Sequence, residues 1–138
     1  MTEFREIEDT DVKGVIALWT ACGLMRPWND PHKDIAFARE SETSTILVAG
    51  HAGRIVASAM VGHDGHRGML YYVAVTPEVQ NRDLGKRAVR AAEDWLRQRG
   101  VWKINLLIRA ENEKVRGFYE RLGYEINPVM CMARKIVD

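Results

Sequence analysis

The most chemically distinctive stretch of this sequence is a polar segment between an apolar run and a helix. It reads Gln80-Asn81-Arg82-Asp83-Leu84-Gly85-Lys86. A loop that enters a helix presents unpaired backbone N–H groups and the positive end of the helix dipole. Such a site binds phosphate or pyrophosphate, and Arg82, Lys86 and Arg87 would add positive charge beside it. From the local pattern alone, a capped and solvated helix start is an equally good interpretation.

Two common nucleotide motifs are excluded at this segment. Gly85-Lys86 lacks the upstream glycine and the following Ser or Thr of a P-loop, and three spaced glycines of a dinucleotide fingerprint are absent. The histidines and the two cysteines form no zinc-ligand spacing, so we expect no metal site. Cys22 and Cys131 are expected to be buried or half-buried structural thiols.

A second candidate is Tyr119, in a predicted helix over residues 112–122. A positioned tyrosine can donate a proton to a leaving group. Taken alone, a tyrosine packed beside Phe118 against the sheet is the simpler interpretation.

Two loops could recognise or deprotonate an acceptor. In Arg26–Pro31, Trp28 could form an apolar wall and Asp30 could attract an ammonium group, or the loop is a rigid helix break with its Trp in the core. In Asp64–Gly68, His66 is the residue type suited to proton uptake at neutral pH, although a loop histidine more commonly lies in a turn or at the surface. The sequence does not choose one general base among five candidates: Asp30, Glu40, His63, Asp64 and His66.

The elements that would position these residues alternate between helical and extended patterns. Helices are predicted over residues 12–19, with Thr10 or Asp11 as N-cap, and over 31–39, 84–99 and 112–122. Strands are predicted over 4–7, 44–49, 54–62, 69–75, 102–108, 124–126 and 129–136, with a hairpin turn at Ala52-Gly53. The helix over 84–99 has the clearest amphipathic stripe. This order indicates an α+β (mixed α/β) fold around one sheet.

Length and charge narrow the class of protein. The 138 residues fit one domain, 1–138, and the net charge of +1 gives no basic excess for nucleic acid. No apolar run is long enough to span a bilayer, so we expect no membrane partner. The N-terminus lacks the pattern of a signal peptide, and a cytoplasmic location is the expectation.

Both chemical segments resemble motifs of the GNAT acetyltransferases. That family carries Gln/Arg-x-x-Gly-x-Gly/Ala before a helix, and Gln80 and Gly85 match its first and last positions. It also carries an Asn and then a Tyr followed by Gly-Phe/Tyr, which Asn112, Tyr119 and Gly123-Tyr124 match. The resemblance covers nearly the whole chain, which is similar to small bacterial GNAT proteins of unassigned substrate.

The resemblance implies a fold and an activity. The fold would be a single GNAT-like domain with a central, mostly antiparallel sheet that is splayed at strands 4 and 5 and flanked by about four helices. The activity would be transfer of acetyl from acetyl-CoA to an amine of a small molecule, peptide or protein by direct attack. The resemblance is also compatible with a homodimer formed through the C-terminal strands.

The resemblance also implies roles for individual residues. Tyr119 would be the general acid that protonates the departing thiolate, and a backbone N–H of the splayed strand would stabilise the oxyanion. Acetyl-CoA would be held by Val73, Val75, Gln80, Asn81, Arg82, Asp83, Leu84, Gly85, Lys86 and Asn112.

Asp83 departs from the family pattern, because the family usually has glycine there and commonly also at Asn81. Glycine permits positive φ and close approach of the backbone to a ligand. An aspartate adds negative charge near a diphosphate, and as a good helix cap it could compete for the same N–H groups. The alternative hypothesis is therefore a catalytically weak or inactive acyl-CoA-binding or regulatory protein on the same fold.

Overall fold

The computed structural model describes residues 3–79 and 83–138, and the chain forms two compact units, Met1–Leu107 and Ile108–Asp138. In the first unit the elements are β1 (Arg5–Glu6), the 3-10 turn η1 (Asp9–Asp11), α1 (Val12–Ala21), α2 (Pro31–Glu40), β2 (Ser44–His51), β3 (Arg54–His63), β4 (Gly68–Val75), the 3-10 turn η2 (Pro77–Val79), α3 (Leu84–Arg97) and β5 (Ile104–Asn105). The second unit contains α4 (Glu113–Arg121).

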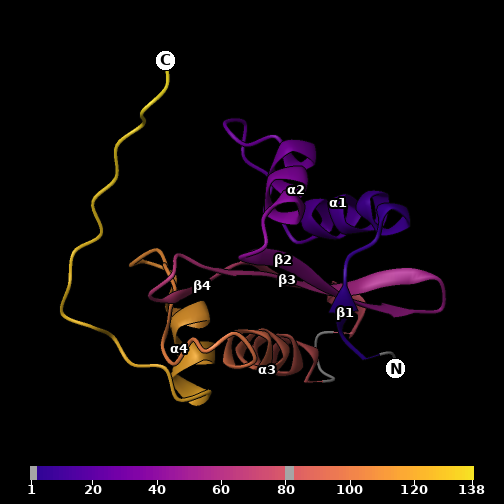
Figure 1. Cartoon of the computed structure of the whole chain (residues 1–138). Helices are drawn as coiled ribbons and strands as arrows, with labels where there is room; N and C mark the ends of the chain where they lie inside the picture. Colours follow the sequence, from indigo (N-terminus) through magenta and orange to yellow (C-terminus); the bar gives the residue numbers. More distant parts are fainter. Residues whose placement is uncertain (1–2, 80–82) are drawn as a thin grey trace. The chain divides into compact units, whose positions relative to one another are not determined.

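One sheet organises the first unit. Its strand order is β1-β2-β3-β4-β5, and every pairing is antiparallel except that of β4 with β5. Helices α1 and α2 pack on one face and α3 on the other, as Figure 1 shows. Both faces of β2 and β3 are covered, which explains why their apolar runs are nearly continuous. The expected α+β class and mostly antiparallel sheet are confirmed.

The sheet opens between β4 and β5. These strands pair only at Gly68 with Ile104 and at Met69 with Asn105, so β4 has no ladder with β5 beyond Met69. The expected splay of the fourth and fifth strands is confirmed. The strand predicted over 102–108 is wrong in extent, because a strand lasts only as long as its ladder has a partner.

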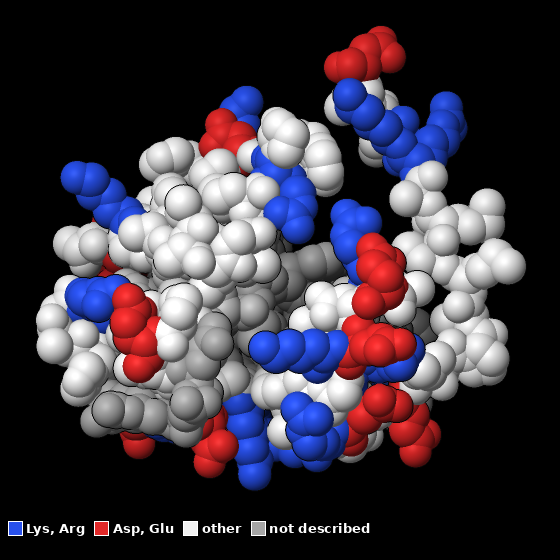
Figure 2. Space-filling view, turned by 180° about the vertical axis from the view of Figure 1, so that it is seen from behind, with Lys and Arg blue, Asp and Glu red and all other residues white. Residues whose placement is uncertain are grey.

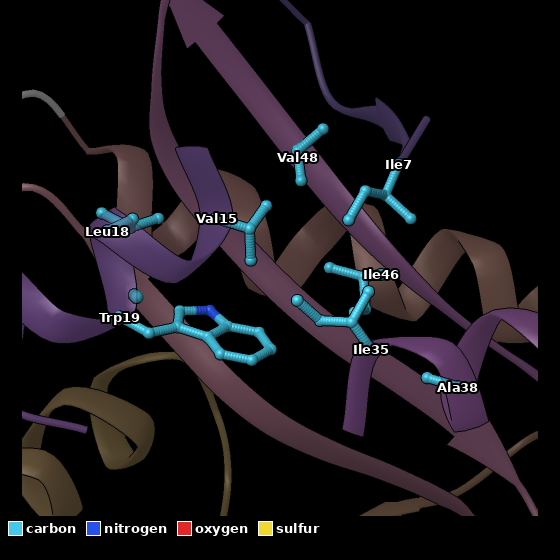
Figure 3. Close-up of a cluster of buried hydrophobic side chains, with 9 residues drawn as sticks. Ile7, Val15, Leu18, Trp19, Ile35, Ala38, Ile46 and Val48 are labelled. Atoms are coloured by element: carbon cyan, nitrogen blue, oxygen red, sulfur yellow. The ribbon is translucent and has the colours of Figure 1, made fainter. Parts of the chain in front are cut away.

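The larger core cluster lies between the sheet and the first two helices. Figure 3 shows apolar side chains from α1 and α2 meeting those of β2 and of the segment after β1. This cluster consists of Ile7, Val15, Leu18, Trp19, Ile35, Ala38, Ile46, Val48 and Ala74. Across the sheet a smaller cluster joins Leu84 of α3 to β2 and β3 through Ala49, Val56 and Ala57. Trp19 is the largest of the fully buried side chains among the described residues.

Local signals explain several element ends. Ala52 and Gly53 both have positive φ, the conformation that a two-residue hairpin turn requires, so the predicted turn is confirmed. Helix α3 runs from Leu84 to Arg97, two residues short of the prediction, and Gly100 follows with a φ of +81°.

On the face that Figure 2 presents, Lys and Arg side chains lie among Asp and Glu side chains.

The predicted strands over 124–126 and 129–136 are wrong. Residues 124–138 contain no helix or strand, and Figure 1 shows them as an extended trace. Their large apolar side chains are 70–90% exposed: Ile126, Val129, Met130, Met132, Ile136 and Val137. Alternating apolar residues favour a strand only where a neighbouring strand accepts the backbone hydrogen bonds. Cys131 is likewise exposed rather than buried, whereas Cys22 is half-buried as expected.

Within 3–79 and 83–138, none of the helices has the length and apolar character to cross a membrane. The same residues include no group of three or more His, Cys, Asp or Glu side chains arranged to hold a metal ion.

Candidate active site

A bulge interrupts β4 at Tyr72 and Val73. Tyr71 pairs with Met60 of β3 and Ala74 pairs with Ser58, so two residues of β4 face the single residue Ala59. Tyr72 has a φ of +50°. A bulky residue in this left-handed region costs on the order of 1–3 kcal/mol and persists only where its surroundings hold it.

Three contacts hold Tyr72 in this conformation. Its ring stacks on the indole of Trp19, and its carbonyl accepts a hydrogen bond of 2.9 Å from Ser58 Oγ. Its hydroxyl donates to Asp34 Oδ2 at 2.8 Å, so a residue of α2 also contacts Tyr72. Ser58 in turn accepts a hydrogen bond of 2.9 Å from Trp19 Nε1. Side chains from α1, α2 and β3 therefore fix both the backbone and the side chain at the bulge.

The hydrogen bond of the Tyr72 carbonyl fixes the direction of the next backbone donor, the N–H of Val73. The carbonyl of Tyr72 points to Ser58, and in a planar trans peptide the next N–H points the opposite way. The N–H of Val73 is therefore directed away from Ser58, along a part of β4 that does not pair with β5.

The Tyr72 hydroxyl lies in a partly enclosed polar environment. Burial is the main cause that raises its pKa to about 12, with the hydrogen bond and negative charge of Asp34 acting in the same direction. A hydrogen bond with the Asn29 side chain and the charge of Arg26 act in the opposite direction. Three side chains, those of Asp34, Asn29 and Arg26, thus act on this hydroxyl from α2 and the α1–α2 loop.

The start of α3 offers backbone donors for an anion. Asp83 precedes the helix with a φ of +57°, and its carbonyl accepts from Arg87 N at 3.0 Å. Its side chain makes no capping hydrogen bond, so the expected competition of that carboxylate for the helix N–H groups is wrong. Gln80, Asn81 and Arg82 lie outside the described residues. The remaining predicted positions, Leu84, Gly85 and Lys86, form the first turn of α3.

Asn112 and Tyr119 both belong to the second unit. Asn112 is the N-cap of α4, where its Oδ1 accepts from Val115 N at 3.2 Å. Tyr119 is 8% exposed, and its ring meets those of Phe118 and Tyr124 edge-on at centroid distances of 4.9 and 5.5 Å. Burial raises the pKa of Tyr119 to about 12, so its hydroxyl is protonated at neutral pH.

The predicted acceptor residues have distinct surroundings. Trp28 is 70% exposed and does not enter the core. Asp30 is the N-cap of α2, because its Oδ1 accepts from His32 N and Lys33 N. His66 is exposed, in a turn that Asp64 Oδ1 closes by accepting from two backbone N–H groups, and these bonds hold the pKa of Asp64 below its usual value.

The remaining base candidates also lie at the surface or in turns. His63 Nδ1 accepts from Gly65 N at 3.0 Å, and Glu40 is the exposed last residue of α2. The carboxylate that meets β4 is instead Asp34. Sequence reasoning missed it because nothing in the local pattern links α2 to a tyrosine 38 residues later.

A family model described as "Acetyltransferase (GNAT) family" matches residues 12–124, which spans most of the chain and parts of both units. The chain belongs to the GNAT family. It is also 38% identical over 135 residues to acetyltransferase YE1169 of Yersinia enterocolitica, covering 98% of this chain and 96% of that protein. It is an acyl-CoA-dependent acetyltransferase, and the donor that the family uses is acetyl-CoA.

Two solved structures of GNAT proteins are similar to this one. AAC(6')-Iy in complex with the bisubstrate analogue CoA-S-monomethyl-acetylneamine has a TM-score of 0.84 at 16% identity, covering 99% of both chains. The ribosomal-protein-S18-alanine N-acetyltransferase of Escherichia coli has a TM-score of 0.75 at 26% identity, covering 89% of this chain and 77% of that one. These similarities support the fold.

The described residues of this GNAT protein fit a CoA thioester. The first turn of α3 offers N–H groups for a diphosphate, since the side chain of Asp83 leaves them uncapped. Val73 and Val75 follow Met69, the last residue of β4 that pairs with β5, and the carbonyl of Val75 accepts a hydrogen bond from Cys22 Sγ at 3.3 Å.

Proposed function

We propose that this acetyltransferase moves the acetyl group directly from acetyl-CoA to an amine nitrogen. The observation that carries the proposal is the direction of the Val73 N–H at the bulge of β4. Acyl transfer builds negative charge on the carbonyl oxygen, and a fixed backbone donor stabilises that charge without reorganising. The edge of a strand that lacks a neighbour on one side also offers backbone groups to an extended ligand arm.

The donor's diphosphate is assigned to the start of α3. Backbone N–H groups of Leu84, Gly85 and Lys86 would bind it, together with Gln80, Asn81 and Arg82 as the family resemblance implies. Backbone groups of Val73 and Val75 would pair with the pantetheine arm. Asn112 would help to position the same arm.

Tyr119 is assigned as the general acid. With a pKa of about 12 it keeps its proton at neutral pH and can donate a hydrogen bond to the departing sulfur. The proton follows as the carbon–sulfur bond breaks, and the phenolate is reprotonated from water. The amine attacks as the neutral base, so a second group has to accept its proton.

The conformation of Asp83 favours an active enzyme over a binding-only protein. Its φ of +57° lies in the region that glycine adopts freely and that aspartate tolerates better than most residues. The replacement of glycine therefore keeps the backbone turn and adds a negative charge. We expect weaker binding of acetyl-CoA than in a protein with glycine, but not its loss.

Calorimetry with acetyl-CoA and a thiol-release assay test the proposal together. The acceptors to try are neamine, benzylamine and a peptide with an N-terminal alanine. Neamine is chosen because the similar AAC(6')-Iy structure holds an acetylneamine bisubstrate analogue, and the alanine peptide because a similar protein is a ribosomal-protein-S18-alanine N-acetyltransferase. Binding with acceptor-dependent thiol release would support direct transfer. Binding without release for every acceptor would support the binding-only alternative, and no binding would contradict the assignment of the donor site.

A further inference from the structure

We propose that the carboxylate of Asp34 holds the ammonium group of the acceptor and receives the proton that the amine loses before it attacks. This inference rests on the proposed transfer to an amine. It concerns a residue on α2 to which neither the sequence motifs nor the family resemblance gives a role.

The carboxylate of Asp34 can accept further hydrogen bonds from a ligand. Tyr72 donates to Asp34 Oδ2, and among the described residues Oδ1 has no hydrogen-bond donor or cation. An ionised carboxylate accepts about four hydrogen bonds. Asp34 is half-buried rather than fully solvated, so a cation beside it gains more than it would at an open surface.

The direction of the hydrogen bond also favours this role. Tyr72 is protonated at neutral pH, since its pKa is about 12, and it therefore acts as the donor to Asp34. The carboxylate is fixed as an acceptor and is left to receive a second donor, such as an ammonium N–H. The other groups that act on the Tyr72 hydroxyl are Arg26 and Asn29 of the α1–α2 loop.

Tyr72 contacts Asp34 through its side chain and orients the Val73 N–H, the proposed oxyanion donor, through its backbone. The backbone of Tyr72 orients the Val73 N–H, while its side chain orients Asp34. The carboxylate therefore stands one tyrosine side chain away from the bulge. An amine and one bridging water fill such a span, and a proton can move through that water.

Asp9 provides a control carboxylate. It is 93% exposed and pairs with Arg39 of α2 at 2.8 Å. Because an exposed ion pair contributes little to stability, Asp9→Asn removes one negative charge and should leave the fold unchanged. Asp34→Asn likewise removes a charge and keeps an oxygen that accepts from Tyr72.

The experiment compares the natural chain, Asp34→Asn and Asp9→Asn with benzylamine, neamine and the alanine peptide as acceptors. We expect Asp34→Asn to lower kcat/KM for the amine by roughly 100-fold or more, with affinity for acetyl-CoA within about 2-fold. Asp9→Asn should stay within about 3-fold. Because the asparagine variant needs amine already deprotonated in solution, its rate should rise about tenfold per pH unit below the pKa of the amine.

Equal activity of the two asparagine variants would overturn the role of Asp34, as would a loss of acetyl-CoA binding in Asp34→Asn. Tyr72→Phe is the second variant if Asp34→Asn does not fold; it keeps the ring on Trp19, removes the hydroxyl and should lower kcat/KM about 10-fold. If the natural chain binds acetyl-CoA but acetylates none of the three amines, the proposed function itself fails, and the inference falls with it.

Discussion

The indole of Trp19 lies against the phenol ring of Tyr72, with ring centroids 3.8 Å apart and an interplanar angle of 9°. The same indole donates to Ser58, whose hydroxyl donates to the Tyr72 carbonyl. Trp19 of α1 thus contacts the ring of Tyr72 directly and holds the Tyr72 carbonyl through the Ser58 hydroxyl. The left-handed conformation at the bulge depends on this arrangement.

Replacing Ser58 by alanine should destabilise the fold. The change leaves two buried polar groups without a hydroxyl partner, Trp19 Nε1 and the Tyr72 carbonyl, and each costs on the order of 1–3 kcal/mol. We expect the free energy of unfolding to fall by about 2–4 kcal/mol in urea titrations. Ser41→Ala, at an exposed serine, should stay within about 0.5 kcal/mol, and similar values for the two variants would contradict the prediction.

Replacing Asp83 by asparagine should strengthen acetyl-CoA binding. Asparagine tolerates the left-handed conformation and removes a negative charge beside the proposed diphosphate site. Near a surface one such charge contributes about 1 kcal/mol, so Kd should fall roughly 5-fold in calorimetry and the gain should shrink with added salt. Asp94→Asn, in the last turn of the same helix, should leave Kd unchanged. An equal gain from that control would show that Asp83 has no special position.

Replacing Tyr119 by phenylalanine should lower kcat and leave acetyl-CoA binding intact. Loss of a proton donor to the leaving thiolate costs typically 100-fold or more, and the aromatic packing with Phe118 and Tyr124 is retained. Thiol release under saturating acceptor measures the effect. Tyr124→Phe is the control for removal of a neighbouring hydroxyl, and a normal kcat in Tyr119→Phe would rule out the general-acid role.

The pair formed by Arg5 and Asp11 should make the free energy of unfolding depend on pH in the acid range. Arg5 Nη1 and Nη2 donate to the Asp11 carboxylate at 2.6 and 3.0 Å, and this interaction is the main reason that the pKa of Asp11 is below its usual value. A lowered pKa means that the stabilisation is complete above the unfolded-state pKa near 4 and is lost as the pH falls through the folded-state value.

Because Arg5 is partly exposed, we expect this pair to contribute only about 1 kcal/mol. Urea titrations between pH 2 and 7 should show a smaller acid-dependent loss for Asp11→Asn than for the natural chain. Asp9→Asn, at a neighbouring exposed carboxylate, should keep the natural pH dependence. Identical profiles for Asp11→Asn and the natural chain would contradict the prediction.

The features that could be predicted from the sequence are those with a local signal. Helix α3 has a continuous amphipathic stripe, and the turn at Ala52-Gly53 has the residues that its geometry needs. The resemblance to GNAT motifs added the splay of the sheet, which is confirmed at β4 and β5.

The features that escaped prediction depend on distant partners. The bulge at Tyr72 lies inside an apolar run with no glycine or asparagine to indicate positive φ, and Ser58 and Trp19 hold it from elsewhere in the chain. Asp34 gains its position from a hydrogen bond across 38 residues. The overprediction of strands after Tyr124 has the same origin, since an apolar alternation does not reveal whether a neighbouring strand exists.

The bulge also limits how this protein can be re-engineered. Ser58 and Trp19 would be ordinary targets for thermostabilising libraries, because both are fully buried and could be replaced by better-packed apolar sets. A variant selected only for heat resistance at these two positions would free the Tyr72 peptide to relax to a regular strand and turn its Val73 amide elsewhere. Selection for stability alone would then lower the rate of acetyl transfer without this being noticed. Such libraries should therefore be screened for the rate of acetyl transfer from the first round.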